Sequence, residues 1–167
     1  MKKKALWGLL AVVAAAGVYA ATVLATPQSG LTTSTVAQAA FPEFNVTGKV
    51  HPANIWRTRL KTHGNSDLYV IDNVLSPGGT SGWHSHPGPS LIFVLRGQVT
   101  NYLGNDPSCT PHVYTAHQGF LDPGGDSVHM LRNEGTVDAE TVAVQVLPQG
   151  ATRKLDMADP GNCHFGG

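Results

Sequence analysis

Two histidines separated by one residue, His84 and His86, are the first residues in this sequence whose type and spacing could do chemistry. They follow a glycine-rich stretch, and an apolar segment, 91–95, begins shortly after them. In a β-strand, residues i and i+2 point to the same face and lie about 6.5–7 Å apart at Cα. Two imidazoles at this spacing can therefore converge on one metal ion. Because the same spacing also occurs on exposed strands that bind nothing, the pair indicates a metal site only if the chain supplies a third ligand.

A second histidine-bearing segment, 117–135, begins about thirty residues after His86. Within it His129 follows a Pro-Gly-Gly turn, at the start of a short β-rich run. An imidazole from a neighbouring strand is what a His-x-His pair needs to form a three-ligand site on one side of a metal ion.

Taken together, the two segments resemble the motifs of the cupins, a family of small β-barrels. The first cupin motif has a Gly, an H-x-H pair, a Glu a few residues on and a further Gly, and the second has a Gly, P-x-G, a His and an Asn. The matching positions here are His84, His86 and Gly97, then Pro123, Gly125, His129 and Asn133. The resemblance covers roughly residues 65–147 and implies an all-β fold, a cupin-type barrel (double-stranded β-helix or jelly roll), with His84, His86 and His129 as metal ligands.

The sequence departs from the cupin pattern at three places. Ser90 stands where the metal-binding Glu is expected, His117 stands where the second motif usually begins with Gly, and the turn between Gly125 and His129 holds one extra residue. Without the carboxylate, a divalent ion would be held by three neutral imidazoles, a donor set that suits Fe or Zn, and the family also uses Mn. A serine hydroxyl stays protonated, so Ser90 could only hydrogen-bond a metal-bound water.

Other candidate site residues follow from the same comparison. Ile92 and Val94 are expected to line an apolar cavity beside the metal. His117 is a candidate for a fourth ligand or acid/base group at the cavity mouth, with a surface position as the alternative. No residue is identified as catalytic.

Two classes of function remain open. A three-histidine site keeps the full charge of its ion and has open positions, so it favours a small anionic or chelating molecule. Some three-histidine cupins are iron dioxygenases, and the resemblance therefore implies a dioxygenase-like oxidoreductase. The alternative is a non-catalytic module that binds or senses a small ligand. No carboxylate pair, nucleophile elbow or phosphate-binding loop indicates a hydrolase or a kinase.

The elements that must position these residues are short strands. β-rich runs broken by Gly, Pro, Asn and Asp turns occupy residues 56–61, 67–75, 91–95, 98–103, 113–115, 128–131 and 141–147. After the N-terminal segment no window keeps a helical period for three turns. This pattern is typical of a β-sandwich or barrel.

The N-terminal residues 1–25 have three lysines followed by an uncharged run of 21 residues. This is the pattern of a signal peptide, with candidate cleavage sites at Val23-Leu24-Ala25 and Ala37-Gln38-Ala39, but the run is also long enough for a membrane anchor. Residues 26–41 are predicted to be a flexible linker, and residues 42–167 a single barrel domain. We therefore expect an exported protein, periplasmic or secreted, with a membrane as a partner only if the segment is uncleaved.

Two cysteines, Cys109 and Cys163, remain in a chain predicted to be exported. An even count in an oxidising compartment favours a disulfide, with two unrelated thiols as the alternative. We expect such a bridge to hold the C-terminal tail more than the histidine motifs. Without the N-terminal lysines, eight basic residues face eleven acidic ones, which argues against a nucleic-acid partner. The expected partner is a small molecule, and a homodimer is left open.

Overall fold

The computed structural model describes residues 25–49 and 56–165, and all regular elements in these ranges are β-strands. The predicted signal peptide or anchor, apart from Ala25, lies outside the described residues. In the ranges that the structure does describe, we find no helix with the length and apolar character needed to cross a membrane.

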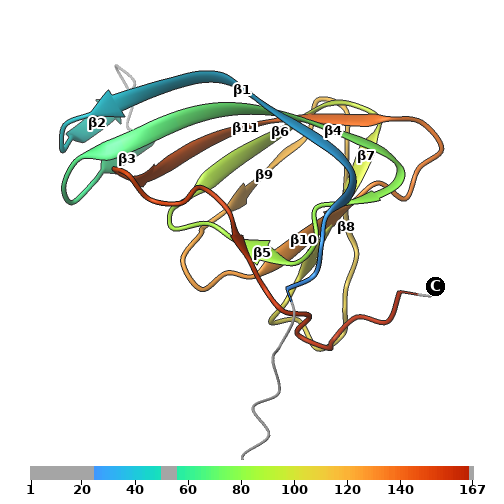
Figure 1. Cartoon of the computed structure of the whole chain (residues 1–167). Helices are drawn as coiled ribbons and strands as arrows, with labels where there is room; N and C mark the ends of the chain where they lie inside the picture. The colour runs from blue at the N-terminus through green and yellow to red at the C-terminus, as the bar shows by residue number, and fades with distance from the viewer. Residues whose placement is uncertain (1–24, 50–55, 166–167) are drawn as a thin grey trace, which may run out of the picture.

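Ten of the strands form one antiparallel sheet that curls into a nearly closed barrel, and β2 and β3 form a separate hairpin (Figure 1). The strand order along the sheet is β12-β5-β10-β4-β11-β6-β9, with β1 paired to β4 and β7 paired to both β10 and β8. The strand bounds are β1 Ser29–Phe41, β2 Asn45–Lys49, β3 Arg57–Lys61, β4 Ser66–Thr80, β5 His84–Ser85, β6 Ser90–Arg96, β7 Gln98–Leu103, β8 His112–Thr115, β9 Gly119–Asp122, β10 His129–Arg132, β11 Ala139–Pro148 and β12 Leu155–Asp156. The all-β prediction is confirmed.

The barrel interior is built by strict alternation along β6 and β11. On β11 the residues 139, 141, 143, 145 and 147 are buried, and the residues between them are partly exposed. Alternation of this kind places every second side chain inside a barrel. Two of the inward residues that line the central cavity, Thr141 and Ala143, are small. The barrel therefore keeps space at its centre instead of filling it with side chains.

The prediction of a flexible linker at residues 26–41 is wrong. Residues 29–41 form β1, which pairs with β4 from Ser29↔Thr80 to Phe41↔Ser66 (Figure 1). The strand was missed because almost all of its side chains are exposed, so it carries no apolar alternation. Its backbone hydrogen bonds to β4 hold it, and the barrel begins before residue 42. The second candidate cleavage site, 37–39, lies inside this strand.

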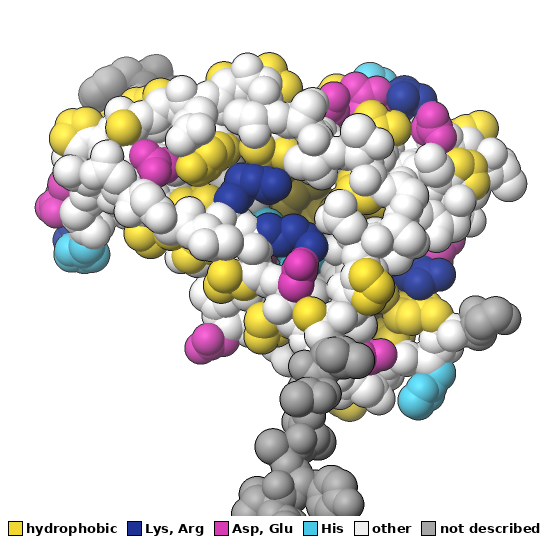
Figure 2. Space-filling view, viewed as in Figure 1, with side chains coloured by type: hydrophobic (Ala, Val, Ile, Leu, Met, Phe, Trp, Pro, Cys, Tyr) yellow, Lys and Arg dark blue, Asp and Glu magenta, His cyan; other side chains and the backbone are white. Residues whose placement is uncertain are grey.

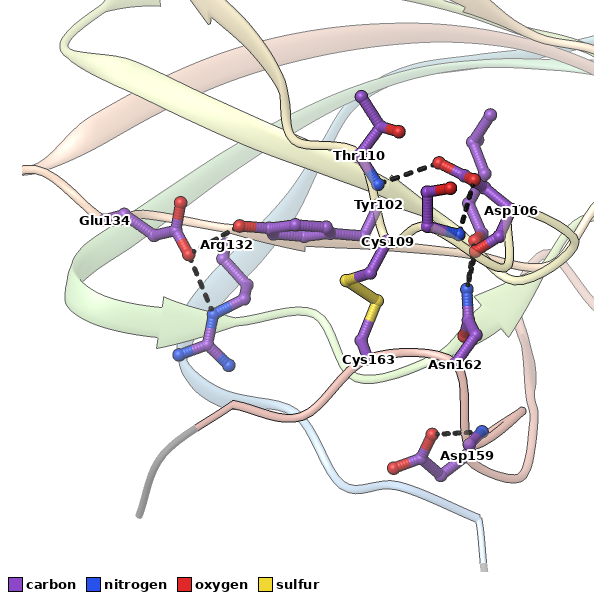
Figure 3. Close-up of a disulfide and its surroundings, with 12 residues drawn as sticks. Tyr102, Asp106, Cys109, Thr110, Arg132, Glu134, Asp159, Asn162 and Cys163 are labelled. Carbon is purple, nitrogen blue, oxygen red and sulfur yellow. Dashed lines mark hydrogen bonds and ion pairs between the residues drawn. A yellow bond between two sulfur atoms is a disulfide. The ribbon is translucent and has the colours of Figure 1, made fainter.

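The predicted disulfide between Cys109 and Cys163 is confirmed, with the two Cα atoms 5.2 Å apart (Figure 3). It joins the tail after β12 to the loop between β7 and β8. Cys163 is buried and belongs to one hydrophobic cluster with Trp83, Tyr102 and Met130. Since Trp83 precedes His84 and Met130 follows His129, the bridge lies against the strands of the histidine motifs and is not confined to the tail.

Candidate metal centre

The structure brings His84, His86 and His129 together inside the barrel. One ligand nitrogen from each ring lies within 4.8 Å of those of the other two, and all three side chains are buried. His84 on β5 and His129 on β10 are directly paired across the two strands. His86 follows β5 and lies two residues from His84, so all three rings enter the same space. We call these residues the histidine triad.

Each ring of the triad is held through its Nδ1 atom. This atom lies 2.9 Å from the carbonyl oxygen of Gly82 in His84, 2.7 Å from that of Arg153 in His86, and 3.1 Å from Oδ1 of Asn101 in His129. Since all three partners are oxygen acceptors, Nδ1 carries the proton and donates it. The lone pair is then on Nε2 in every ring, which is the arrangement found in metal-ligating histidines.

Two glycine turns fix the distance between the histidine motifs. The backbone N–H of Gly125 donates to the carbonyl oxygen of His86 over 2.7 Å. Next to it Gly124 has φ +71°, and a Cβ at this position would overlap the carbonyl oxygen of Gly88. The turn before His129 thus packs directly on the turn after His86, and only glycine allows so close an approach. The extra residue in the second motif is accommodated without separating the rings.

Burial keeps the triad neutral. Desolvation lowers the pKa of His129 to about 3 and is also the largest cause of the lowered pKa of His84 and His86. The neighbouring imidazoles lower the pKa of His84 further. Three neutral rings with their lone pairs on one side can act as ligands near pH 7 without first losing protons.

A buried carboxylate, Asp122 at the end of β9, lies beside the triad. Its Oδ2 atom is 3.7 Å from Nε2 of His129, and in the described structure neither atom has a hydrogen-bond partner. Burial raises the pKa of Asp122. Because His129 is neutral near pH 7, this contact is not an ion pair.

The triad lies on the wall of a cavity of about 180 Å³. Its lining combines apolar residues such as Leu31, Ile92 and Ala143 with polar ones such as Thr33 and Gln145. Arg153 and Lys154 also line it, and Figure 2 shows basic side chains over a hollow in which apolar and histidine side chains are visible. Lys154 pairs with Asp156, whereas Arg153 has no carboxylate at ion-pair distance among the residues described.

The other predicted site residues divide into two groups. Ser90 and Ile92 line the cavity, and the Ser90 hydroxyl accepts a hydrogen bond from Gln145 over 3.0 Å. Val94 and His117 do not, so the cavity position expected for them is wrong, whereas the surface alternative for His117 holds. Val94 packs with Val99 and Ala139 in a separate hydrophobic cluster. His117 is exposed, in a turn with φ +71°, where its backbone N–H donates to the carbonyl oxygen of Val94.

Several residues of the site were missed in the sequence. Asp122 had a usable signal, because it is a carboxylate directly before the Pro-Gly-Gly turn of the second motif. Asn101, Gln145 and Arg153 had none, because they come from other strands or from the segment after β11. Gln28, Leu31 and Thr33 were assigned to the linker and line the cavity instead.

The residues present fit a divalent cation. One ligand nitrogen of each imidazole lies within 4.8 Å of the others, each ring is oriented by an acceptor at Nδ1, and two buried polar atoms next to each other have no partner within the described structure. A site of this composition suits Zn, Fe, Cu or Ni among the divalent ions. The prediction that the three histidines form one cluster is confirmed, and metal binding itself stays a prediction.

Comparisons with known proteins agree with the family predicted from the motifs. Residues 73–145, just under half of the chain, match the family described as "Cupin domain". A search among curated proteins finds none that matches this chain.

Solved structures similar to this chain include three of different kinds. An uncharacterized conserved protein with a double-stranded β-helix domain from Klebsiella pneumoniae is 23% identical, with TM-score 0.46 over 54% of this chain and 75% of its own. The polyketide cyclase RemF from Streptomyces resistomycificus is 18% identical, with TM-score 0.46 over 56% and 64%. An oxalate oxidase in complex with the substrate analogue glycolate is 25% identical, with TM-score 0.42 over 47% of this chain and only 41% of its own. A cupin-domain match over residues 73–145 and a nearly closed antiparallel barrel that carries two histidine motifs together support a cupin superfamily protein.

Proposed function

We propose that this protein binds one divalent metal ion through Nε2 of His84, His86 and His129, and uses it to hold a small anionic or chelating molecule in the barrel. The observation that carries the proposal is the orientation of the triad. Three independent acceptors hold the Nδ1 atoms, so the Nε2 lone pairs are the ones that can bind a common ligand, and the Gln145 amide nitrogen, 3.4 Å from Nε2 of His86, would have to move aside for it. Within the described structure the buried Nε2 atom of His129 has no hydrogen-bond partner, which is unfavourable unless a cation binds its lone pair.

The charge of the cavity supports an anionic ligand. Arg153 and Lys154 lie at its lining, and the ion would add positive charge a short distance away. The Lys154 charge is offset by Asp156, so Arg153 is the side chain that would pair with a carboxylate. Its guanidinium group donates to Oε1 of Gln145 over 3.3 Å, which directs it toward the cavity. The volume of about 180 Å³ favours a molecule of a few non-hydrogen atoms.

The chemistry proposed for the site is an oxygen-dependent oxidation of this small molecule, with Fe or Mn as the ion. A redox-active ion held on one side by three protein ligands supplies electron transfer and open positions for two reactants. The chain's own residues would bind and orient the molecule, and the apolar wall at Leu31, Ile92 and Ala143 would exclude water from it.

A binding or sensing module is the second candidate, and one feature of the cavity lining favours it. Among the described residues that line the cavity, none is a carboxylate or a tyrosine that could transfer protons. With Zn, which has no redox chemistry, the site would bind its ligand and do no more.

The place of action that we propose is outside the cytoplasm, periplasmic or secreted. The disulfide between Cys109 and Cys163 supports this proposal, because such bonds persist in oxidising compartments. Cleavage after Ala25 would leave β1 whole, whereas cleavage at 37–39 would remove Leu31 and Thr33 from the cavity wall.

Elemental analysis of protein purified from its native compartment tests the metal site. We expect close to one equivalent of metal in the native protein and almost none in the double variant His84→Ala/His86→Ala. A full equivalent in that variant would place the ion elsewhere. Ligand selection is tested with Arg153→Gln, which keeps the backbone oxygen that holds His86. Small mono- and dicarboxylates should bind the variant at least about tenfold more weakly, the usual value of a charge-assisted pair.

Catalysis is tested by recording oxygen consumption of the iron- and manganese-loaded protein with small carboxylates, diketones and catechol-like acids. Oxygen uptake that requires both a substrate and His129 supports the oxidoreductase. Tight binding without turnover for every compound supports the binding module instead.

A further inference from the structure

The strand next to β6 carries a carboxylate opposite the position where the cupin pattern expects one. Ser90 replaces the expected glutamate at the start of β6, and in the register of β6 with β9 its direct partner is Asp122. Side chains directly opposite each other on antiparallel strands lie on the same face, with Cβ atoms about 4.5–5.5 Å apart. Asp122 is therefore on the inward face that Ser90 shares.

The contacts of Asp122 leave one of its oxygens unused. Oδ1 accepts a hydrogen bond from the backbone N–H of Gly124 over 3.1 Å, which fixes the carboxylate. Oδ2 has no partner within the described structure, although the residue is only 3% exposed. It lies 3.7 Å from Nε2 of His129, which is also without a partner.

With Asp122 ionised, this contact joins two groups that cannot satisfy each other. The Nδ1 proton of His129 is donated to Asn101, so its Nε2 atom is an acceptor, and the carboxylate oxygen is an acceptor as well. Two buried acceptors side by side cost free energy unless a cation lies between or beside them. A divalent ion on the three Nε2 atoms would supply that positive charge.

We propose that Asp122 is the carboxylate of this metal centre, supplied from β9 at the position opposite Ser90 in place of a glutamate on β6. The proposal rests on the three-histidine site proposed above. Asp122 lies outside the cluster of ligand atoms within 4.8 Å of one another, so its charge acts on the ion from beside His129. The negative charge of Asp122 lowers the net charge of the metal centre. Because Asp122 supplies this charge, strong metal binding does not require a glutamate at position 90.

Isothermal titration calorimetry with Mn²⁺ and Zn²⁺ tests this assignment on four proteins: the wild type, Asp122→Asn, Ser90→Ala and Ser90→Glu/Asp122→Asn. Asparagine keeps the shape and the acceptor for Gly124 but removes the charge. We expect Asp122→Asn to weaken metal binding about 10–100-fold, as loss of a partner around metal ligands usually does. Ser90→Ala should change it by less than about threefold. Restoring a carboxylate at position 90 in the double variant should recover most of the loss.

Stability without metal separates this role from a structural one. If Asp122 serves the ion, the metal-free Asp122→Asn variant is at least as stable to urea as the metal-free wild type, because a buried charge without a partner has been removed. Only the metal-loaded variant is less stable. A loss of stability in both forms, or metal affinity equal to that of the wild type, overturns the assignment. A wild type that binds neither ion overturns the three-histidine site and this inference with it.

Discussion

Removal of the disulfide is expected to lower the stability of the whole barrel. Cys109 and Cys163 are 54 residues apart in the sequence, so the bond closes a long loop in the unfolded chain. The chain-entropy relation gives about 4 kcal/mol for a loop of this length, as an upper limit. For a domain of this size, that corresponds to a fall in melting temperature of about 8–16 °C.

The effect should reach the histidine triad through the packing of Cys163. This residue shares a cluster with Trp83 and Met130, the chain neighbours of His84 and His129. The tail has other attachments: the Phe165 ring lies 4.9 Å from the Tyr102 ring and 4.2 Å from the Arg132 guanidinium carbon. These contacts keep part of the cluster covered, so we expect metal affinity to fall only a few-fold.

The measurement is urea denaturation of the wild type, with and without a reductant, and of the double variant Cys109→Ser/Cys163→Ser. Phe165→Ala is the matched control, because it loosens the tail and leaves the bond intact. We expect the reduced wild type and the double variant to lose similar stability, and more than Phe165→Ala. A double variant within about 1 kcal/mol of the oxidised wild type would refute the loop-entropy argument. An equally large loss in Phe165→Ala would show that packing of the tail, not the covalent bond, carries the effect.

Three further predictions concern the triad and its supports. Asn101→Ala removes the acceptor at Nδ1 of His129 and should weaken Zn²⁺ binding about 10–100-fold in a competition titration with a chelator; unchanged affinity would exclude a positioning role. Gly124→Ala should abolish metal binding because its Cβ overlaps the turn after His86, whereas Gly125→Ala, with no atom within 4 Å of its Cβ, should retain it; equal losses would mean that backbone strain alone matters. Without metal, His84, His86 and His129 take up protons below about pH 6.5 in the unfolded chain but stay neutral in the folded protein. The free energy of unfolding should therefore fall as the pH is lowered from 7 to 5, by up to about 1.4 kcal/mol per pH unit for each ring. The raised pKa of the Asp122 carboxyl has the opposite effect on stability, because the folded protein binds that proton more tightly than the unfolded chain does. A flat urea midpoint over this range would contradict the lowered pKa values.

Much of the candidate site could be predicted from local spacing. The two-residue period of a strand places His84 and His86 on one side, and the Pro-Gly-Gly turn indicates the strand that begins at His129. The cupin resemblance placed Ile92 at the cavity correctly. It failed for Val94, because the cavity ends before that residue and the interior beyond it is closed by Val99 and Ala139. It also failed for His117, which a left-handed turn directs to the surface.

The sequence by itself determined the all-β class, the cupin resemblance and the three histidines, because each depends on residues close together or on a short motif, and it determined the cysteine pair because the chain has only two cysteines. Only the tertiary structure decided that residues 29–41 form a strand, since that strand is held by backbone hydrogen bonds to β4 and leaves its side chains exposed. Only the register of β6 with β9 places Asp122 opposite Ser90. The position of Arg153 at the cavity likewise depends on how the segment after β11 packs back over the barrel. Pairings between distant strands are set by the closure of the whole barrel, and no local period in the sequence encodes them.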